Sequence, residues 1–195
     1  MLLSSDYPLP GIIQDQIEGL VTQQQFPWYL VKETTFADGG WRPYEGKFDN
    51  SSFSHVVVME YEPVSQYYDL FESALRIIAD AAGQDFSDVY RVRLGCLLPD
   101  KLEHHCPHVD FQEEHVTALY YVNDSDGDTI FFTDEMSIFQ RQCQLRVSPE
   151  RGKMVVFKGD VLHASSSPTT GYRICLLYTS PSPRNATLSR MPSSA

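Results

Sequence analysis

The chain has 195 residues, of which 42% are hydrophobic and 21% are charged, and these proportions predict one soluble globular domain with a sizeable core. Its formal net charge of −11 argues against nonspecific binding to nucleic-acid backbones, which requires a positively charged surface. No apolar run approaches the ~20 residues of a membrane helix, and the first residues lack the pattern of a secretion signal.

Periodic apolar residues predict two helices, over residues 11–24 and 64–82. Short apolar or alternating runs predict strands in the second half of the chain and at a few earlier positions. These runs are residues 26–31, 55–61, 89–98, 116–123, 129–132, 145–147 and 153–157, with a last strand opening at 172. Residues 34–54 and 133–144 are read as loops that cover a substrate. Helices followed by many short strands indicate an α+β chain with a β-barrel or sandwich core.

His108 and Asp110 are the residues around which the chemistry is expected to form. In an extended strand, residues two apart point to the same side, so this imidazole and this carboxylate leave one face together. With a distant histidine, His163, they make the two-histidine, one-carboxylate set that binds iron(II) and leaves positions open. Arg173 follows His163 by ten residues. We therefore expect His108, Asp110 and His163 to be both the metal ligands and the catalytic centre.

These motifs, together with the Val116–Asn123 strand and the Gly127-Asp128-Thr129 turn, resemble the iron(II)/2-oxoglutarate-dependent dioxygenase superfamily. The nearest branch is the prolyl-4-hydroxylase-like one, in its marine phage and bacterial form. The resemblance covers residues 89–174 and extends weakly back to 26–29. It implies a double-stranded β-helix (jelly-roll) core with N-terminal helices packed on one sheet. It also implies Fe(2+), 2-oxoglutarate and O2, with ascorbate as a possible addition.

The resemblance implies hydroxylation of a protein side chain, with a prolyl residue favoured, or of a small molecule. The chain would act in the cytoplasm of a bacterium or a phage-infected cell, where its four irregularly spaced cysteines stay reduced. Related halogenating enzymes carry a small residue in place of the acid, so Asp110 favours hydroxylation. The oligomeric state is left open.

Co-substrate binding is assigned to the same sheet. The planar fork of Arg173 matches the distal carboxylate of 2-oxoglutarate. By resemblance, Tyr121 donates its hydroxyl to that carboxylate, while Thr117 and Leu119 line the pocket beside it. Many relatives carry a tyrosine where this chain has Leu98.

Arg91 and Arg93 are possible substitutes for that missing tyrosine, or simply part of a solvated strand face. The run from His104 to His108 invites a zinc interpretation, but no second Cys/His pair at finger-like spacing accompanies it. We expect His104, His105 and Cys106 to lie on the rim of the iron site. His115 is expected to face solvent or the partner sheet, and His55 to be structural.

Two other functions remain open from the sequence. One is a non-catalytic metal-binding β-barrel module, which predicts metal binding without turnover. The other is a nucleic-acid demethylase of the same superfamily, against which the acidic charge weighs. Residues 175–184 and 189–195 resemble a translated sequencing adapter, which predicts one dioxygenase domain over residues 1–174 and a non-native tail over 175–195.

Overall fold

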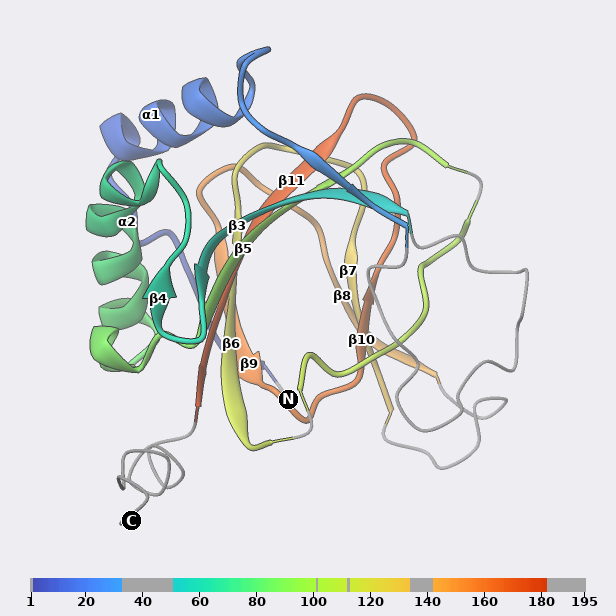
Figure 1. The fold of residues 1–195 in the computed structure, drawn as a ribbon. Coiled ribbons are helices and arrows are strands. Elements are labelled where there is room, and N and C mark those ends of the chain that lie inside the picture. Colours follow the sequence, from blue (N-terminus) through green and yellow to red (C-terminus); the bar gives the residue numbers. More distant parts are fainter. Residues whose placement is uncertain (1, 33–50, 101, 112, 134–141, 182–195) are drawn as a thin grey trace.

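A computed structural model describes residues 2–32, 51–100, 102–111, 113–133 and 142–181. Within these ranges the chain forms a large and a small antiparallel sheet that face each other, with helices on one side (Figure 1). This arrangement confirms the predicted α+β jelly-roll class. No helix of the described part is long and apolar enough to cross a membrane.

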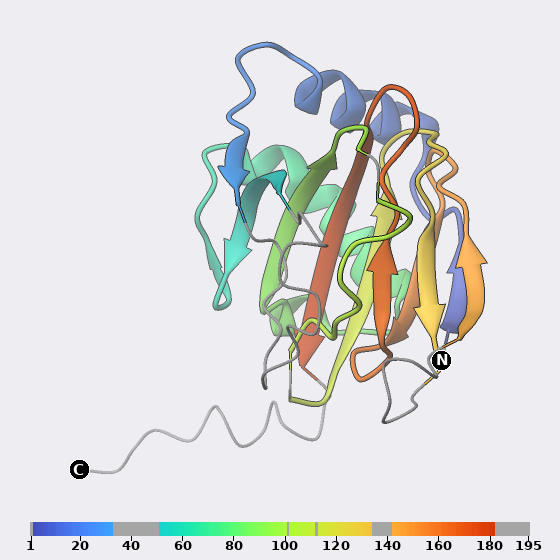
Figure 2. The same ribbon diagram turned by 90° about the vertical axis from the view of Figure 1, so that its right-hand side faces the viewer.

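The large sheet carries most of the strands, in the order β1-β9-β6-β11-β5-β3-β2, with β4 paired to β3 at the side. Their bounds are β1 Leu2–Asp6, β2 Tyr29–Val31, β3 Ser52–Met59, β4 Glu62–Pro63, β5 Arg91–Leu97, β6 His115–Tyr121, β9 Met154–Lys158 and β11 Arg173–Pro181. The small sheet has the order β10-β7-β8, formed by His163–Ser165, Thr129–Phe132 and Cys143–Val147. Figure 2 shows the strands of the small sheet beside the large one.

Two helices, α1 (Gly11–Val21) and α2 (Tyr68–Ala81), cover the outer face of the large sheet, as predicted (Figure 1). In α2 the buried residues Phe71, Ala74, Leu75 and Ile78 recur at three- and four-residue spacing, which places them on one stripe. A short 3-10 helix, Phe86–Asp88, leads into β5. The stripe packs on outward-facing strand residues such as Leu94.

The inner face of the large sheet, by contrast, packs toward the small sheet. Alternation along β6 and β11 turns Leu119, Tyr121, Cys175 and Leu177 to this side, where they cluster with Phe131 of β7. The candidate site lies on this inner face, at the end where the His108 segment approaches β10. The helix layer therefore supports the sheet from behind without entering the site.

Two features differ from the sequence-based expectations. Strand β1 was not predicted, although it pairs with β9 at the edge of the sheet. The His108–Asp110 segment is not a regular strand, because His108 forms only a single bridge with His163. Pro107 precedes His108 and has no N–H to continue a ladder.

Other predictions concern parts of the chain that are only partly described. The predicted loops at 34–54 and 133–144 fall mostly on 33–50 and 134–141, outside the described residues. The predicted boundary after Ile174 falls inside β11, whose residues 175–180 are buried between β5 and β6. Residues 182–195 also lie outside the described part. The domain boundary stays a prediction.

Candidate active site

His108 and His163 are joined through their backbones. The His108 N–H donates to the His163 carbonyl at 2.9 Å, and the His163 N–H donates to the His108 carbonyl at 3.0 Å. His163 is also the first residue of β10, which pairs with β7. The bridge therefore fixes two histidines from distant segments side by side, with ring centroids 4.6 Å apart.

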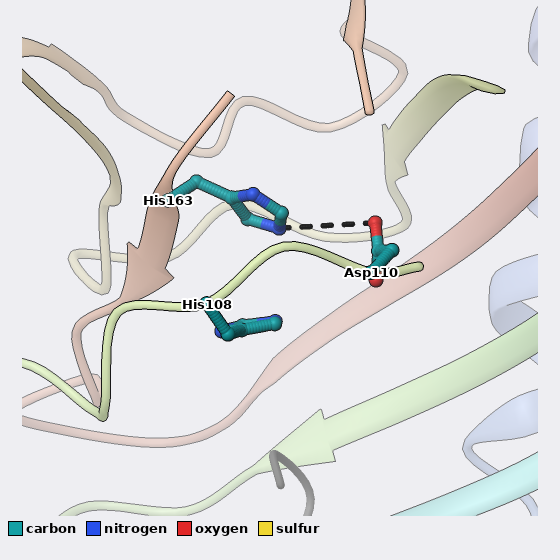
Figure 3. Close-up of side chains that lie close together, drawn as sticks. All are labelled: His108, Asp110 and His163. Atoms are coloured by element: carbon teal, nitrogen blue, oxygen red, sulfur yellow. Dashed lines mark ion pairs between the residues drawn. The ribbon is translucent and has the colours of Figure 1, made fainter. Parts of the chain in front are cut away.

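Asp110 completes a group whose ligand atoms all lie within 4.8 Å of one another (Figure 3). His163 Nε2 lies 3.8 Å from Asp110 Oδ2. Each imidazole is oriented by a backbone carbonyl, because His108 Nδ1 lies 3.0 Å from the Cys106 oxygen and His163 Nδ1 lies 2.9 Å from the Val161 oxygen. A carbonyl only accepts, so each Nδ1 carries the proton and each Nε2 presents a lone pair.

The protonation states also suit a metal. Burial, followed by the nearby His163, lowers the pKa of His108 to about 3, so this imidazole is neutral at pH 7. Burial would raise the pKa of Asp110, but His163, His108 and two guanidiniums outweigh it and lower that pKa to about 2. A neutral imidazole and an ionised carboxylate are the forms that coordinate metal ions.

Two side chains hold Asp110 in place. The Thr117 hydroxyl donates to Oδ2 at 3.0 Å, and Arg91 Nη2 lies 3.5 Å from Oδ1. Arg91 in turn stacks over the Phe111 ring at 4.3 Å from its centroid. Thr117, which the sequence placed on the co-substrate pocket, thus contacts the acid of the triad.

Arg173 lies in the same cavity and is only 4% exposed. Its Nη1 donates to Ser165 Oγ at 2.9 Å and its Nη2 to Thr129 Oγ1 at 2.8 Å, while its buried Nε has no partner among the described residues. No carboxylate of the described part forms an ion pair with it. A buried cation without a counter-charge is costly, so the arrangement suits an anionic ligand.

Thr129 links Arg173 to Tyr121. Its hydroxyl oxygen accepts from Tyr121 Oη at 2.7 Å as well as from Arg173, so its own proton is free to be donated into the cavity. Burial raises the pKa of Tyr121 to about 12, which keeps the phenol protonated. Tyr121 lies behind Thr129, and Thr129 itself lines the cavity. Leu119 also lines the cavity.

The cavity measures about 90 Å³ and contains the triad and Arg173 together. Since one water needs about 10–15 Å³ by this measure, there is room for several waters or a small diacid. The orphan Nε of Arg173, the two hydroxyls beside it and the three convergent ligand atoms fit 2-oxoglutarate and a ferrous ion. Leu119, Cys175 and Leu177 supply an apolar wall.

Comparison with known proteins agrees with this chemistry. Residues 98–178, which contain the triad and Arg173, match the family model described as the 2OG-Fe(II) oxygenase superfamily. Over this segment the chain is similar to that superfamily. Its members use iron(II), 2-oxoglutarate and O2. A comparison of the sequence with curated proteins finds no match.

Solved structures of 2OG-Fe(II) oxygenases share the fold. A family member from Burkholderia pseudomallei is 14% identical, with a TM-score of 0.62 over 92% of this chain and 84% of that one. A Pseudomonas putida prolyl-4-hydroxylase is 14% identical, with a TM-score of 0.57 and 91% of each chain covered. A Trichoplax adhaerens prolyl hydroxylase in complex with a hypoxia-inducible-factor peptide is 12% identical, with a TM-score of 0.60 over 96% of this chain and 87% of that one.

The histidines outside the triad make contacts of their own. His105 is buried, lines the cavity, and lies 2.7 Å from Ser167 Oγ and 3.2 Å from Asp100 Oδ2. His104 lies 2.7 Å from the His105 carbonyl oxygen. In the described ranges, the three-residue group close enough for a metal is the triad, so the His104–His108 run does not gather as a zinc site.

The remaining predictions are settled by burial and contacts. His115 is buried edge-on to Phe111 and does not face solvent, while His55 links Pro27 to Ser65 and is structural. Leu98 is 50% exposed. Sequence reasoning missed the contacts of Thr129 and Ser165 with Arg173, because Thr129 was noted only as part of a turn and Ser165 lies on a short strand without a motif.

Proposed function

We propose that this chain is an iron(II)- and 2-oxoglutarate-dependent hydroxylase. His108, Asp110 and His163 would hold the metal, and Arg173 would hold the distal carboxylate of 2-oxoglutarate. The observation that carries the proposal is the convergence of three ligand atoms within 4.8 Å of one another, in one cavity with a buried, uncompensated guanidinium.

When bound, the metal and 2-oxoglutarate supply the oxidising chemistry: O2 places one oxygen in succinate and one in the substrate, CO2 leaves, and a substrate C–H becomes C–OH. The chain's own residues position these reactants. The two imidazoles and Asp110 offer three ligand positions, and Thr117 and Arg91 keep the carboxylate oriented. Thr129 and Ser165 orient the Arg173 guanidinium through hydrogen bonds. The apolar side chains of Leu119, Cys175 and Leu177 limit the access of water to the cavity.

The substrate is either a protein side chain or a small molecule. The likeness to two prolyl hydroxylases, one of them holding a peptide, favours a prolyl side chain by analogy. Asp110 favours hydroxylation over halogenation, because it fills the position that a halide would need.

The test is succinate formation from 2-oxoglutarate by the purified chain with iron(II) and O2, offered peptide, nucleotide and amino-acid pools. We expect substrate-dependent succinate that is lost in His163→Ala and kept in His104→Ala, whose side chain lies outside the triad. Metal and 2-oxoglutarate binding without succinate from any pool would instead identify a non-catalytic module. Succinate production driven only by nucleotides would identify a demethylase.

A further inference from the structure

Arg93 is a cavity residue that the iron and 2-oxoglutarate sites leave unused. Building on the proposed function, we propose that Arg93 binds a carboxylate of the organic substrate, and that this substrate is a small free carboxylic acid such as an amino acid. The proposal chooses between the two substrate classes left open above, because a residue inside a peptide has no free α-carboxylate.

The position of Arg93 separates it from the co-substrate end of the cavity. On β5, Arg93 pairs with Leu177 of β11, whereas Leu97 pairs with Arg173. The Arg93–Leu177 pair and the Leu97–Arg173 pair are four residues apart along β5, which corresponds to about 13 Å at ~3.3 Å per residue. Arg91, one step further on the same face, contacts Asp110. Arg93 therefore lies on the metal-ligand side and Arg173 at the opposite end.

Arg93 also lacks the partners that its neighbours have. Arg91 has Asp110, and Arg173 has Ser165 and Thr129. In the described part of the chain, Arg93 forms no hydrogen bond or ion pair through its side chain. Burial lowers the pKa of Arg93, with Asp110 acting in the opposite direction, so the structure holds a partly desolvated cation without a direct counter-charge.

Charge counting indicates an anion at this place. Apart from its histidines, the charged residues lining the cavity are Arg93, Arg173 and Asp110. A ferrous ion and the 2-oxoglutarate dianion cancel each other, and Asp110 is paired with Arg91, which lies outside the cavity lining. Positive charge from Arg93 then remains in the loaded cavity, and a substrate carboxylate would neutralise it with two hydrogen bonds from one planar fork.

Space for such a group is present beside Arg93. Gly95 is the next inward-facing residue of β5, and a Cβ built on it meets no atom within 4 Å. Ser54 of β3 pairs with Gly95 and also lines the cavity. The cavity between Arg93 and Leu97 is therefore open, as a co-substrate reaching from Arg173 to the metal ligands requires, and a substrate carboxylate would meet Arg93 at the metal-ligand end.

The test measures binding, without turnover. The anaerobic protein loaded with iron(II) and 2-oxoglutarate is dialysed against a panel of proteinogenic L-amino acids and the matching α-amides. We expect at least one free acid to bind and its amide to bind much more weakly. Arg93→Gln should weaken that acid about 10- to 150-fold, as expected for a lost charge-assisted contact, and Arg93→Lys should restore part of the affinity.

Three measurements keep the outcome decisive. Arg76→Gln removes a surface arginine of α2 and should leave acid binding unchanged. A 2-oxoglutarate affinity that falls in Arg93→Gln would overturn the inference, because Arg93 would then serve the co-substrate. Equal binding of acid and amide, or binding only of acidic peptides, would also overturn it. Failure of iron or 2-oxoglutarate to bind the unaltered chain would instead contradict the proposed function.

Discussion

His108 and His163 hold each other in place through two reciprocal backbone hydrogen bonds, at 2.9 and 3.0 Å, although 55 residues separate them in sequence. The contact joins the loop before β6 to the first residue of β10. Because the bridge is made by backbone atoms, it persists when either side chain is changed. Each imidazole can therefore be removed without separating the two segments.

This independence makes the ligand assignment testable. His108→Ala or His163→Ala should lower iron(II) affinity by more than about 100-fold, which exceeds the 10–100-fold typical of residues that only orient a ligand. The fold should remain, since the backbone bridge is kept. Metal-binding calorimetry and circular dichroism measure the two effects. An unchanged affinity in either variant would remove that histidine from the metal site.

Thr117 should act on the metal through Asp110. Thr117→Val keeps the shape but removes the donor to Asp110 Oδ2, so iron(II) affinity should fall about 10- to 100-fold. Thr117→Ser keeps a hydroxyl and should stay close to the unaltered protein. If instead Thr117→Val changed only the affinity for 2-oxoglutarate, the residue would belong to the co-substrate pocket.

Replacing Arg173 should abolish 2-oxoglutarate binding without lowering the stability of the unliganded chain. Arg173→Met replaces a buried, uncompensated cation with an apolar side chain, so the free energy of unfolding without ligand should stay equal or rise. 2-Oxoglutarate should stabilise the unaltered iron-loaded chain by about 2.7 kcal/mol at 100 times its Kd, and should not stabilise the variant. Urea unfolding with and without 2-oxoglutarate measures both. Equal stabilisation of the two proteins would contradict the assignment.

Tyr121 and Thr129 should differ in their effect on 2-oxoglutarate. Tyr121 donates to Thr129 and lies behind it, so Tyr121→Phe should cost about 1 kcal/mol of binding or less. Thr129→Val removes the group that faces the cavity and should cost about 1.5–3 kcal/mol, whereas Thr129→Ser should not. Binding isotherms on the iron-loaded protein give the values. A larger loss in Tyr121→Phe would favour direct contact between the phenol and the carboxylate.

The convergence of the triad with Arg173 could be predicted because their spacing forms a motif, and the helices could be predicted because apolar residues repeat along them. Thr129 and Ser165 could not, since each is an ordinary hydroxyl on a short strand of the small sheet and gains its role only when β7 and β10 pair. Tyr121 was predicted on the correct face of β6. That face alone does not show that Thr129 stands between the phenol and the cavity.

Arg93 illustrates a different limit. Alternation along β5 puts Arg91 and Arg93 on one face, and the sequence offers both as substitutes for a tyrosine at the Leu98 position. Only the folded structure separates them, because Arg91 lies beside Asp110 of a distant segment and Arg93 lines the cavity. Register depends on long-range pairing, which a single sequence does not specify.

The most direct measurement is the stoichiometry of ligand binding by the anaerobic protein. One iron(II) should bind per chain, one 2-oxoglutarate should bind only after the iron, and His108→Ala should abolish both events. Binding of 2-oxoglutarate at full affinity without iron, or iron binding that survives in both His108→Ala and His163→Ala, would show that these side chains do not form one ferrous site.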